Sequence, residues 1–153
     1  MAHTTDQQQL VNEGSGMRLD HVGISVADLD SMLDWYGQAL EMTSTGHFEV
    51  QPLELRGAFL VHPGGLVLEL LERAGSAALP APATQPEALL RRGYGHLCLR
   101  VTDVDQLHAT LLRHGAIEKM APCPSPQPGV RMSFVADPEG NFIELIDRKE
   151  PLA

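Results

Sequence analysis

Apolar and polar residues alternate along residues 19–26, and this alternation predicts a β-strand. Because successive side chains of a strand point to opposite faces, His21 lies on the face opposite to Val22. Apolar residues then recur at helical spacing over residues 29–40, which predicts a helix. Asp28 precedes this stretch and is its candidate N-cap.

Two further strands are predicted at residues 55–62 and 66–72, because both stretches are short and largely apolar. The turn sequence HPGG separates them at residues 62–65. A weaker signal near residues 46–50 indicates one more strand. The first half of the chain therefore predicts the order βαβββ.

The second half of the chain predicts the same order of elements, four of which its own pattern marks. They are a strand at 95–101, a helix at 104–114 and strands at 130–136 and 141–147. Residues 121–129 (APCPSPQPG) are rich in proline, and we expect them to form a loop that covers a cleft.

The two halves also match residue by residue. RGAFLVHPGGLVLELLER at residues 56–73 aligns with RMSFVADPEGNFIELIDR at 131–148, which lies 75 positions later. Some polar residues inside otherwise apolar strands are paired by this offset, namely His21 with His96 and Glu69 with Glu144. Two copies packed face to face would gather two imidazoles and two carboxylates, a donor set that binds divalent metal ions.

The repeat predicts one domain over residues 17–150. Its two modules, 17–73 and 95–148, are joined by a linker at 74–94 that is rich in proline and alanine. Each module has an apolar sheet face that it cannot bury alone, so we expect the modules to pack together. Residues 1–16 are polar and aperiodic, which predicts a disordered tail without chemistry.

The composition is that of an ordinary globular protein, with 43% hydrophobic and 20% charged residues among 153. The net charge of −9, without a basic stripe, argues against nucleic acids and anionic membrane surfaces as partners. No apolar run reaches the length of a membrane span. The two cysteines, Cys98 and Cys123, form no CxxC motif, so we expect a reducing, cytoplasmic setting.

Each of the four repeated residues has an ordinary explanation when it is taken alone. A single histidine in a strand is more often a hydrogen-bonded core residue than a ligand, and a glutamate at a strand end usually faces solvent. The joint repeat of both residue types favours one shared metal site instead. Zn²⁺, Fe²⁺, Ni²⁺, Co²⁺ and Mn²⁺ all accept such ligands, and the sequence does not choose among them. Four protein ligands leave an octahedral ion open to water or substrate, which is typical of a catalytic site.

Three segments carry a resemblance to a known family: LDHVGISVADLDSMLDWYGQAL, GYGHLCLRVTDVDQLHATLLRHGA and FVADPEGNFIELID. They resemble the vicinal oxygen chelate (VOC) superfamily, which includes glyoxalase I, methylmalonyl-CoA epimerase, extradiol dioxygenases and the fosfomycin and bleomycin resistance proteins. The resemblance covers about residues 17–148. It implies an α+β fold in which two βαβββ modules form an open, curled mixed β-sheet barrel with helices outside. It also implies a homodimer, in which one chain or two supply the metal ligands.

The superfamily's four ligand positions fall here on His21, Glu69, His96 and Glu144. In the ring-cleaving dioxygenases the ligand triad corresponds to His21, His96 and Glu144 alone. Glu69 therefore favours a likeness to glyoxalase I and the epimerase, which use a fourth ligand. A complete ligand set also disfavours the resistance proteins that only trap drugs.

Glyoxalase I and the epimerase share one elementary step, which the resemblance implies for this chain. A proton leaves the carbon next to a carbonyl, and a metal ion stabilises the resulting enediolate or enolate. The base would be Glu144 first and Glu69 second. One alternative function is an Fe(II) extradiol dioxygenase, with His47 or His62 as an extra acid–base group. The other is a non-catalytic protein that binds a drug and confers resistance.

Candidate contacts to a small-molecule substrate lie outside the repeated residues. Arg100 shares a strand face with His96 and is a candidate partner for an anionic group, although an arginine at a strand end commonly reaches solvent. Tyr94 precedes the second histidine and is expected at the cleft mouth, and His47 is a third candidate. Arg56 and Arg131 are repeated, which favours a structural role instead.

Overall fold

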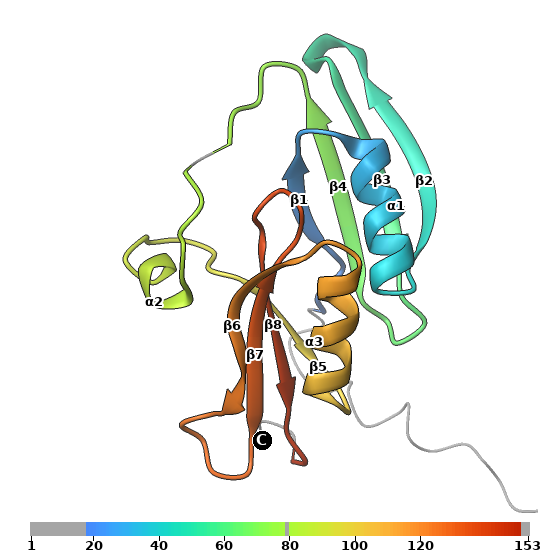
Figure 1. Cartoon of the computed structure of the whole chain (residues 1–153). Coiled ribbons are helices and arrows are strands. Elements are labelled where there is room, and N and C mark those ends of the chain that lie inside the picture. Colours follow the sequence, from blue (N-terminus) through green and yellow to red (C-terminus); the bar gives the residue numbers. More distant parts are fainter. Residues whose placement is uncertain (1–17, 79, 151–153) are drawn as a thin grey trace, which may run out of the picture.

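The computed structural model describes residues 18–78 and 80–150 (Figure 1). The prediction for the tail at 1–16 lies outside the described residues. In chain order the elements are β1 (Val22–Val26), α1 (Leu29–Ala39), β2 (Thr43–Val50), a 3₁₀ turn (Gln51–Leu53), β3 (Leu55–Val61), β4 (Val67–Arg73), α2 (Gln85–Ala88), β5 (Leu97–Arg100), α3 (Val104–Arg113), β6 (Ile117–Pro124), β7 (Arg131–Ala136) and β8 (Phe142–Asp147).

The strands form two four-stranded sheets of identical topology, visible one above the other in Figure 1. The strand order is β1-β4-β3-β2 in the first sheet and β5-β8-β7-β6 in the second. The pairs β1–β4 and β5–β8 are parallel, and all other neighbours are antiparallel. The predicted α+β class and the two βαβββ modules are therefore confirmed.

One predicted loop is in part a strand. The prediction of a loop over residues 121–129 is wrong for its first half, because β6 extends to Pro124. The remaining residues form a tight hairpin turn in which the Ser125 amide donates to the Val130 carbonyl at 2.8 Å. Pro122 and Pro124 are tolerated because β6 is an edge strand with register shifts, where missing amide donors disturb no further strand.

Each long helix covers one face of its own sheet. Ala58 of β3 and Leu68 and Leu70 of β4 belong to the core beneath α1, and all three are fully buried. This core continues into the second module, where Leu111 of α3 and Leu145 of β8 are also fully buried. The opposite face of each sheet is more open. Half-buried and exposed side chains alternate along β5 and along β1 up to Ser25, and only Val26 at the end of β1 is buried.

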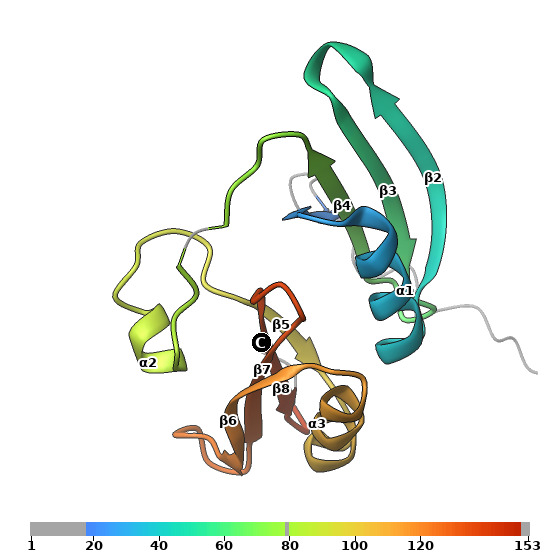
Figure 2. The same ribbon diagram turned by 45° about the horizontal axis from the view of Figure 1, so that its top comes forward.

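The linker covers part of this second open face. Ala88 of α2 packs against Phe134, Ala136 and Phe142, and Figure 2 shows α2 on the side of β7 away from α3. Thr84 is the N-cap of α2, and its side chain accepts a hydrogen bond from the Glu87 amide.

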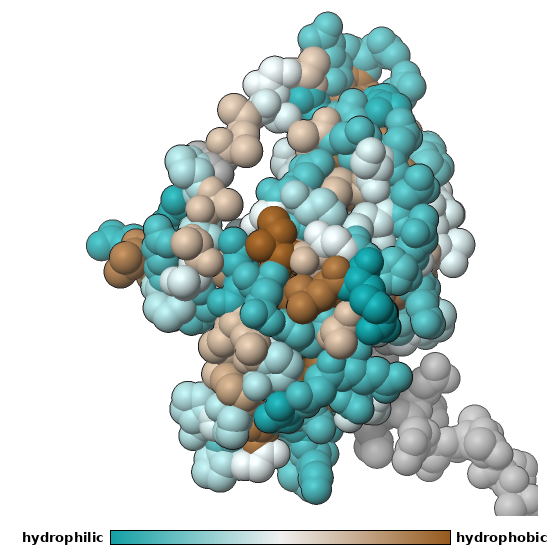
Figure 3. Space-filling model, viewed as in Figure 1, coloured by the Kyte–Doolittle hydropathy of each residue, from teal (hydrophilic) through white to brown (hydrophobic). Residues whose placement is uncertain are grey.

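The surface in Figure 3 is mostly hydrophilic, with scattered hydrophobic side chains. Leu89 and Leu90, directly after α2, are 65% and 84% exposed. Among the described residues, none of the helices combines the length and the apolar character that a membrane span requires.

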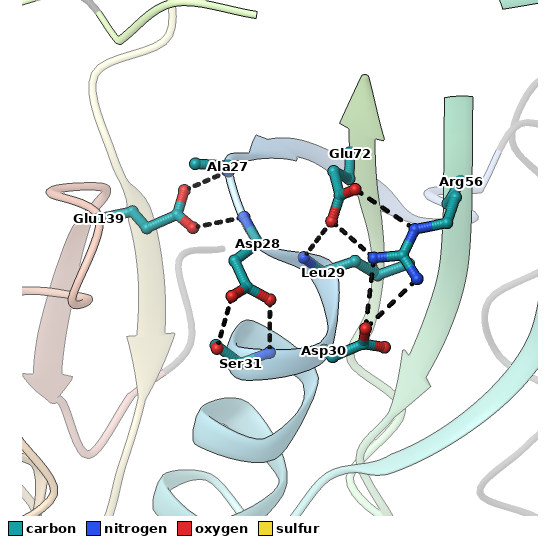
Figure 4. A network of polar contacts seen from close by, with 8 residues as sticks. All are labelled: Ala27, Asp28, Leu29, Asp30, Ser31, Arg56, Glu72 and Glu139. Atoms are coloured by element: carbon teal, nitrogen blue, oxygen red, sulfur yellow. Dashed lines mark hydrogen bonds and ion pairs between the residues drawn. The ribbon is translucent and has the colours of Figure 1, made fainter. Parts of the chain in front are cut away.

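The repeated arginines are structural, as the sequence predicted. Arg56 of β3 donates to Asp30 at the start of α1 and to Glu72 of β4 (Figure 4). Arg131 of β7 donates to Asp105 at the start of α3 at 2.7 Å. Each arginine therefore ties the first turn of a helix to the sheet that the helix covers.

The Arg56–Glu72 pair gives the stability of the protein a pH dependence of defined sign. Hydrogen bonds from Arg56 and from the Leu29 amide lower the pKa of Glu72 from its ordinary value of 4.5. The pair therefore stabilises the fold fully at pH values above 4.5, the ordinary pKa. This stabilisation is lost as the pH falls below 4.5 and through the lower pKa of the folded state. We expect Glu72→Gln to lower the free energy of unfolding at about pH 7 and to lower it less at about pH 3, where part of this stabilisation is already lost. Urea unfolding measures both, and equal losses at the two pH values would contradict this assignment.

Candidate metal and active site

The first His–Glu pair lies on the open face of the first sheet. His21 directly precedes β1, and its Nε2 lies 3.4 Å from Oε2 of Glu69 on β4. The two side chains are 33% and 19% exposed. Phe59 is the register partner of Glu69 on β3, and its ring meets the His21 ring edge to face at 5.5 Å.

The second pair repeats this arrangement on the second sheet. His96 directly precedes β5, and its Nε2 lies 3.0 Å from Oε2 of Glu144 on β8. These side chains are 28% and 14% exposed. Phe134 is the register partner of Glu144, and its ring meets the His96 ring at 5.2 Å. Both pairs therefore present an imidazole and a carboxylate over an aromatic ring.

The chain does not bring the two pairs together. Within residues 18–78 and 80–150, no three His, Cys, Asp or Glu side chains are grouped so that they could hold a metal ion. The fold thus joins His21 to Glu69 and His96 to Glu144, and leaves each pair as one half of the predicted donor set.

The first pair has an outer partner that its counterpart lacks. Asp20 Oδ2 lies 2.8 Å from His21 Nδ1, and this hydrogen bond raises the pKa of His21 more than the nearby charge of Glu69 does. A carboxylate on one ring nitrogen orients the imidazole and leaves the other nitrogen for a metal. Gly95 stands at the equivalent position before His96 and has no side chain to offer.

The second pair has a thiol as neighbour. Cys98 is the register partner of Glu144, whereas Gly23 is the register partner of Glu69. Desolvation and the Glu144 carboxylate raise the pKa of Cys98 to about 12, so the thiol stays protonated near neutral pH. The two pairs therefore share their ligand types and differ in their surroundings.

The model of the Glyoxalase/Bleomycin resistance protein/Dioxygenase superfamily matches residues 18–145. The chain belongs to this superfamily. The match includes both modules and all four residues of the two pairs, so the resemblance noted in the sequence is confirmed.

Curated relatives within the superfamily are lactoylglutathione lyases. The chain is 29% identical over 139 residues to a probable lactoylglutathione lyase of Vibrio cholerae, with 89% of the chain and 94% of the relative covered. It is 27% identical over 168 residues to the lactoylglutathione lyase of Schizosaccharomyces pombe, with 98% of the chain and 51% of the relative covered. The chain thus spans about half of this longer yeast protein.

Solved structures of the superfamily share the fold. Glyoxalase I of Leishmania major, described as trypanothione-dependent, is 29% identical with a TM-score of 0.64, over 87% of this chain and 88% of that one. Glyoxalase I of Zea mays has a TM-score of 0.68 over 85% of this chain and 44% of that one. Its identity is 23%, so this second likeness concerns the fold alone.

The predicted substrate residues of this superfamily member lie in three different settings. Tyr94 is fully exposed two residues before His96. Arg100 is exposed, and its guanidinium donates to the Lys149 carbonyl at 2.9 Å. His47 lies 3.0 Å from the Ser44 hydroxyl and lines a hollow of about 320 Å³ with Arg56 and the start of α1. None of the three has a hydrogen bond to either pair among the described residues.

Sequence reasoning missed two kinds of site neighbour. Phe59 and Phe134 are matched by the repeat, so their equal spacing from the ligands was a usable signal that they flank the imidazoles. Asp20 is not repeated and carried no such signal. Its role depends on the conformation of the chain just before β1, in which its carboxylate meets the neighbouring His21 ring.

Proposed function

We propose that this protein is a divalent-metal-dependent lyase or isomerase that transfers a proton at the carbon next to a carbonyl group. The observation that carries the proposal is the pair of matched half-sites, each with an imidazole Nε2 facing a carboxylate oxygen. The lactoylglutathione lyases among the relatives support a lyase in particular.

The donor atoms of these half-sites fit a divalent metal ion. Ligand bonds of about 2.1 Å at a right angle place two donor atoms about 3.0 Å apart. The nitrogen–oxygen separations of 3.4 Å in the first pair and 3.0 Å in the second are close to this value. His21, Glu69, His96 and Glu144 would therefore hold one ion of Zn²⁺, Ni²⁺, Co²⁺, Fe²⁺ or Mn²⁺ with little rearrangement.

A second copy of the chain is proposed to complete the site. The first pair of one copy would meet the second pair of the other, and a two-fold axis would create two equivalent sites. Two observations support this arrangement. All four side chains are partly exposed, and no grouping of three candidate ligands occurs within the described part of one chain.

The residues of the completed site would divide the chemistry among them. A bound divalent ion supplies Lewis-acid polarisation of the substrate carbonyl. Glu144 would take the proton from the neighbouring carbon and return it to the adjacent carbon or to the other face, and Glu69 is the second candidate for this role. Phe59 and Phe134 lie against the imidazole rings and would keep water from that side of the cleft.

Metal analysis and solvent deuterium test this proposal. We expect the protein purified without chelator to carry about one divalent ion per chain and to lose it to EDTA. Deuterium from solvent should enter the substrate carbon next to the carbonyl, and Glu144→Gln should slow this exchange by about 100-fold or more, because it removes the base.

A matched control is available elsewhere in the fold. Glu118 of β6 forms another His–Glu pair, 2.9 Å from Nε2 of the buried His108 on α3. Glu118→Gln is expected to leave the exchange rate unchanged. Undiminished exchange in Glu144→Gln would remove Glu144 as the base. Less than about a tenth of an equivalent of metal, with no activity restored by Ni²⁺, Co²⁺ or Zn²⁺, would overturn the enzyme proposal. Oxygen uptake with Fe²⁺ and catechols would instead favour the dioxygenase alternative.

A further inference from the structure

The β7–β8 turn of the second module binds the start of α1 in the first module through the side chain of Glu139. Glu139 Oε2 accepts a hydrogen bond from the Ala27 amide at 2.7 Å, and Oε1 accepts one from the Asp28 amide at 3.1 Å (Figure 4). One carboxylate therefore holds two consecutive backbone groups of a different module. Hydrogen bonds to a charged acceptor are about twice as strong as neutral ones.

This contact does more than cap the helix, because α1 has its own capping groups. Asp28 accepts hydrogen bonds from the Ser31 amide and hydroxyl, and Glu72 accepts one from the Leu29 amide (Figure 4). The two amides that Glu139 holds belong to the connection between β1 and α1, just before the first helical turn.

The turn that carries Glu139 is itself held firmly. Asp137 is fully buried, and its carboxylate accepts hydrogen bonds from the amides of Glu139 and Asn141 at 3.0 and 2.8 Å. Gly140 adopts a φ of +92°, a left-handed conformation that favours glycine. The Tyr36 hydroxyl of α1 donates to the same Asp137 carboxylate at 2.9 Å, which adds a second link between the modules.

The repeat shows that a βαβββ module does not itself need these two hydrogen bonds. The position equivalent to Glu139 in the first module is Gly64, and the position equivalent to Asp137 is His62. Gly64 has no side chain with which to hold the start of α3. The carboxylate therefore serves the junction between the modules, which occurs once in the chain.

The two segments that Glu139 connects, the β1–α1 connection and the β7–β8 turn, lead directly to the two half-sites. Ala27 ends the segment that starts at His21, and Asn141 starts the segment that contains Glu144. His21 lies six residues before Ala27, which is roughly 20 Å along an extended chain. A rotation of about 5° about the Glu139 contact would therefore displace His21 by roughly 2 Å. Metal–ligand distances tolerate deviations of only about 0.2 Å.

We infer that Glu139 is a positioning residue, which fixes the angle between the two modules and thereby sets how the half-sites of two copies meet around one ion. This inference rests on the proposed two-copy metal site. In a closed two-fold dimer both sites form together only at one angle between the modules, so a loosened junction weakens both sites at once.

Co²⁺ binding to the full chain tests this role. We expect Glu139→Ala to weaken Co²⁺ binding by at least about tenfold and to alter the visible absorption spectrum of the bound ion, because the ligand geometry changes. Glu139→Gln retains one acceptor oxygen for an amide and should lie closer to the wild type.

Asp103→Ala is the matched control. Asp103 is the N-cap of α3 and accepts a hydrogen bond from the Gln106 amide within its own module. Its loss should lower the stability of the protein, as the loss of a helix cap does, and should leave the Co²⁺ affinity and spectrum unchanged. A Glu139→Ala protein with the wild-type Co²⁺ affinity and spectrum would overturn the inference.

A built-in reporter separates failure of this inference from failure of the proposed function. Trp35 is the only tryptophan of the chain, it is 8% exposed, and its Nε1 donates to the His114 carbonyl of the other module at 2.8 Å. We expect Glu139→Ala to shift the Trp35 emission to longer wavelength without any metal, and Asp103→Ala to leave it unchanged. A wild type that binds no metal would overturn the proposed function and the metal-positioning role together. Unchanged Trp35 emission in Glu139→Ala would overturn the claim that Glu139 fixes the angle between the modules.

Discussion

Mixing two metal-free variants is expected to restore metal binding. The double variant His21→Ala/Glu69→Ala lacks the first pair, and His96→Ala/Glu144→Ala lacks the second. Alone, each is expected to lose about 100-fold or more in metal affinity, because every site lacks two of its four ligands. In a mixed dimer one site combines the two intact pairs, and the other has none. Random exchange of subunits makes about half of the dimers mixed. Because each mixed dimer has one intact site out of two, about a quarter of the wild-type metal content should return.

The measurement is the metal content of each variant alone and of the two after co-expression or joint refolding. Native mass spectrometry supplies the control, since it counts the mixed dimers directly. Mixed dimers that form and bind no metal would place all four ligands within one chain. Either outcome concerns the ligands alone and is independent of the substrate.

Replacing Asp137 with Ala is expected to be the most destabilising of the single substitutions considered. Its buried carboxylate accepts hydrogen bonds from the Tyr36 hydroxyl, from the Glu139 and Asn141 amides and from the Asn141 side chain. Removing it leaves the buried Tyr36 hydroxyl and three partly buried donors without an acceptor, which costs about 3 kcal/mol or more. Urea unfolding monitored by Trp35 fluorescence measures the loss.

Tyr36→Phe is the matched control for this prediction. It removes a single donor and leaves the turn intact, so a loss of about 1 kcal/mol is expected. Burial and the neighbouring Asp137 raise the pKa of Tyr36, so its hydroxyl remains a donor throughout the pH range of such an experiment. Equal losses in both variants would show that the other three hydrogen bonds of Asp137 contribute little.

Local pattern was sufficient for most of the secondary structure. The helix expected at 29–40 is α1 (Leu29–Ala39), and the one expected at 104–114 is α3 (Val104–Arg113). Both begin at an Asp N-cap and bury an apolar stripe, so local propensity and tertiary packing agree. The two edge strands were less predictable. Most side chains of β2 are exposed and β6 contains two prolines, so neither shows a clear alternation.

The candidate site was predictable only as far as the repeat extends. His21 with Glu69 and His96 with Glu144 follow from the offset, because equal positions in equal modules acquire equal neighbours. The distance between the pairs does not follow from it. That distance depends on how the modules are joined, through contacts such as Tyr36 with Asp137, which lie 101 residues apart and are not repeated. No local pattern encodes such a contact.

The unequal surroundings of the two pairs have a consequence for stereochemistry. In the first pair Asp20 orients His21, and Gly23 lies beside Glu69. In the second pair the neutral thiol of Cys98 lies beside Glu144. A substrate held between them in the proposed cleft would meet two carboxylates of unlike environment. Enantiotopic hydrogens on one carbon would then exchange at different rates. A cleft built from two modules of the same fold would in this way yield a single enantiomer of the product.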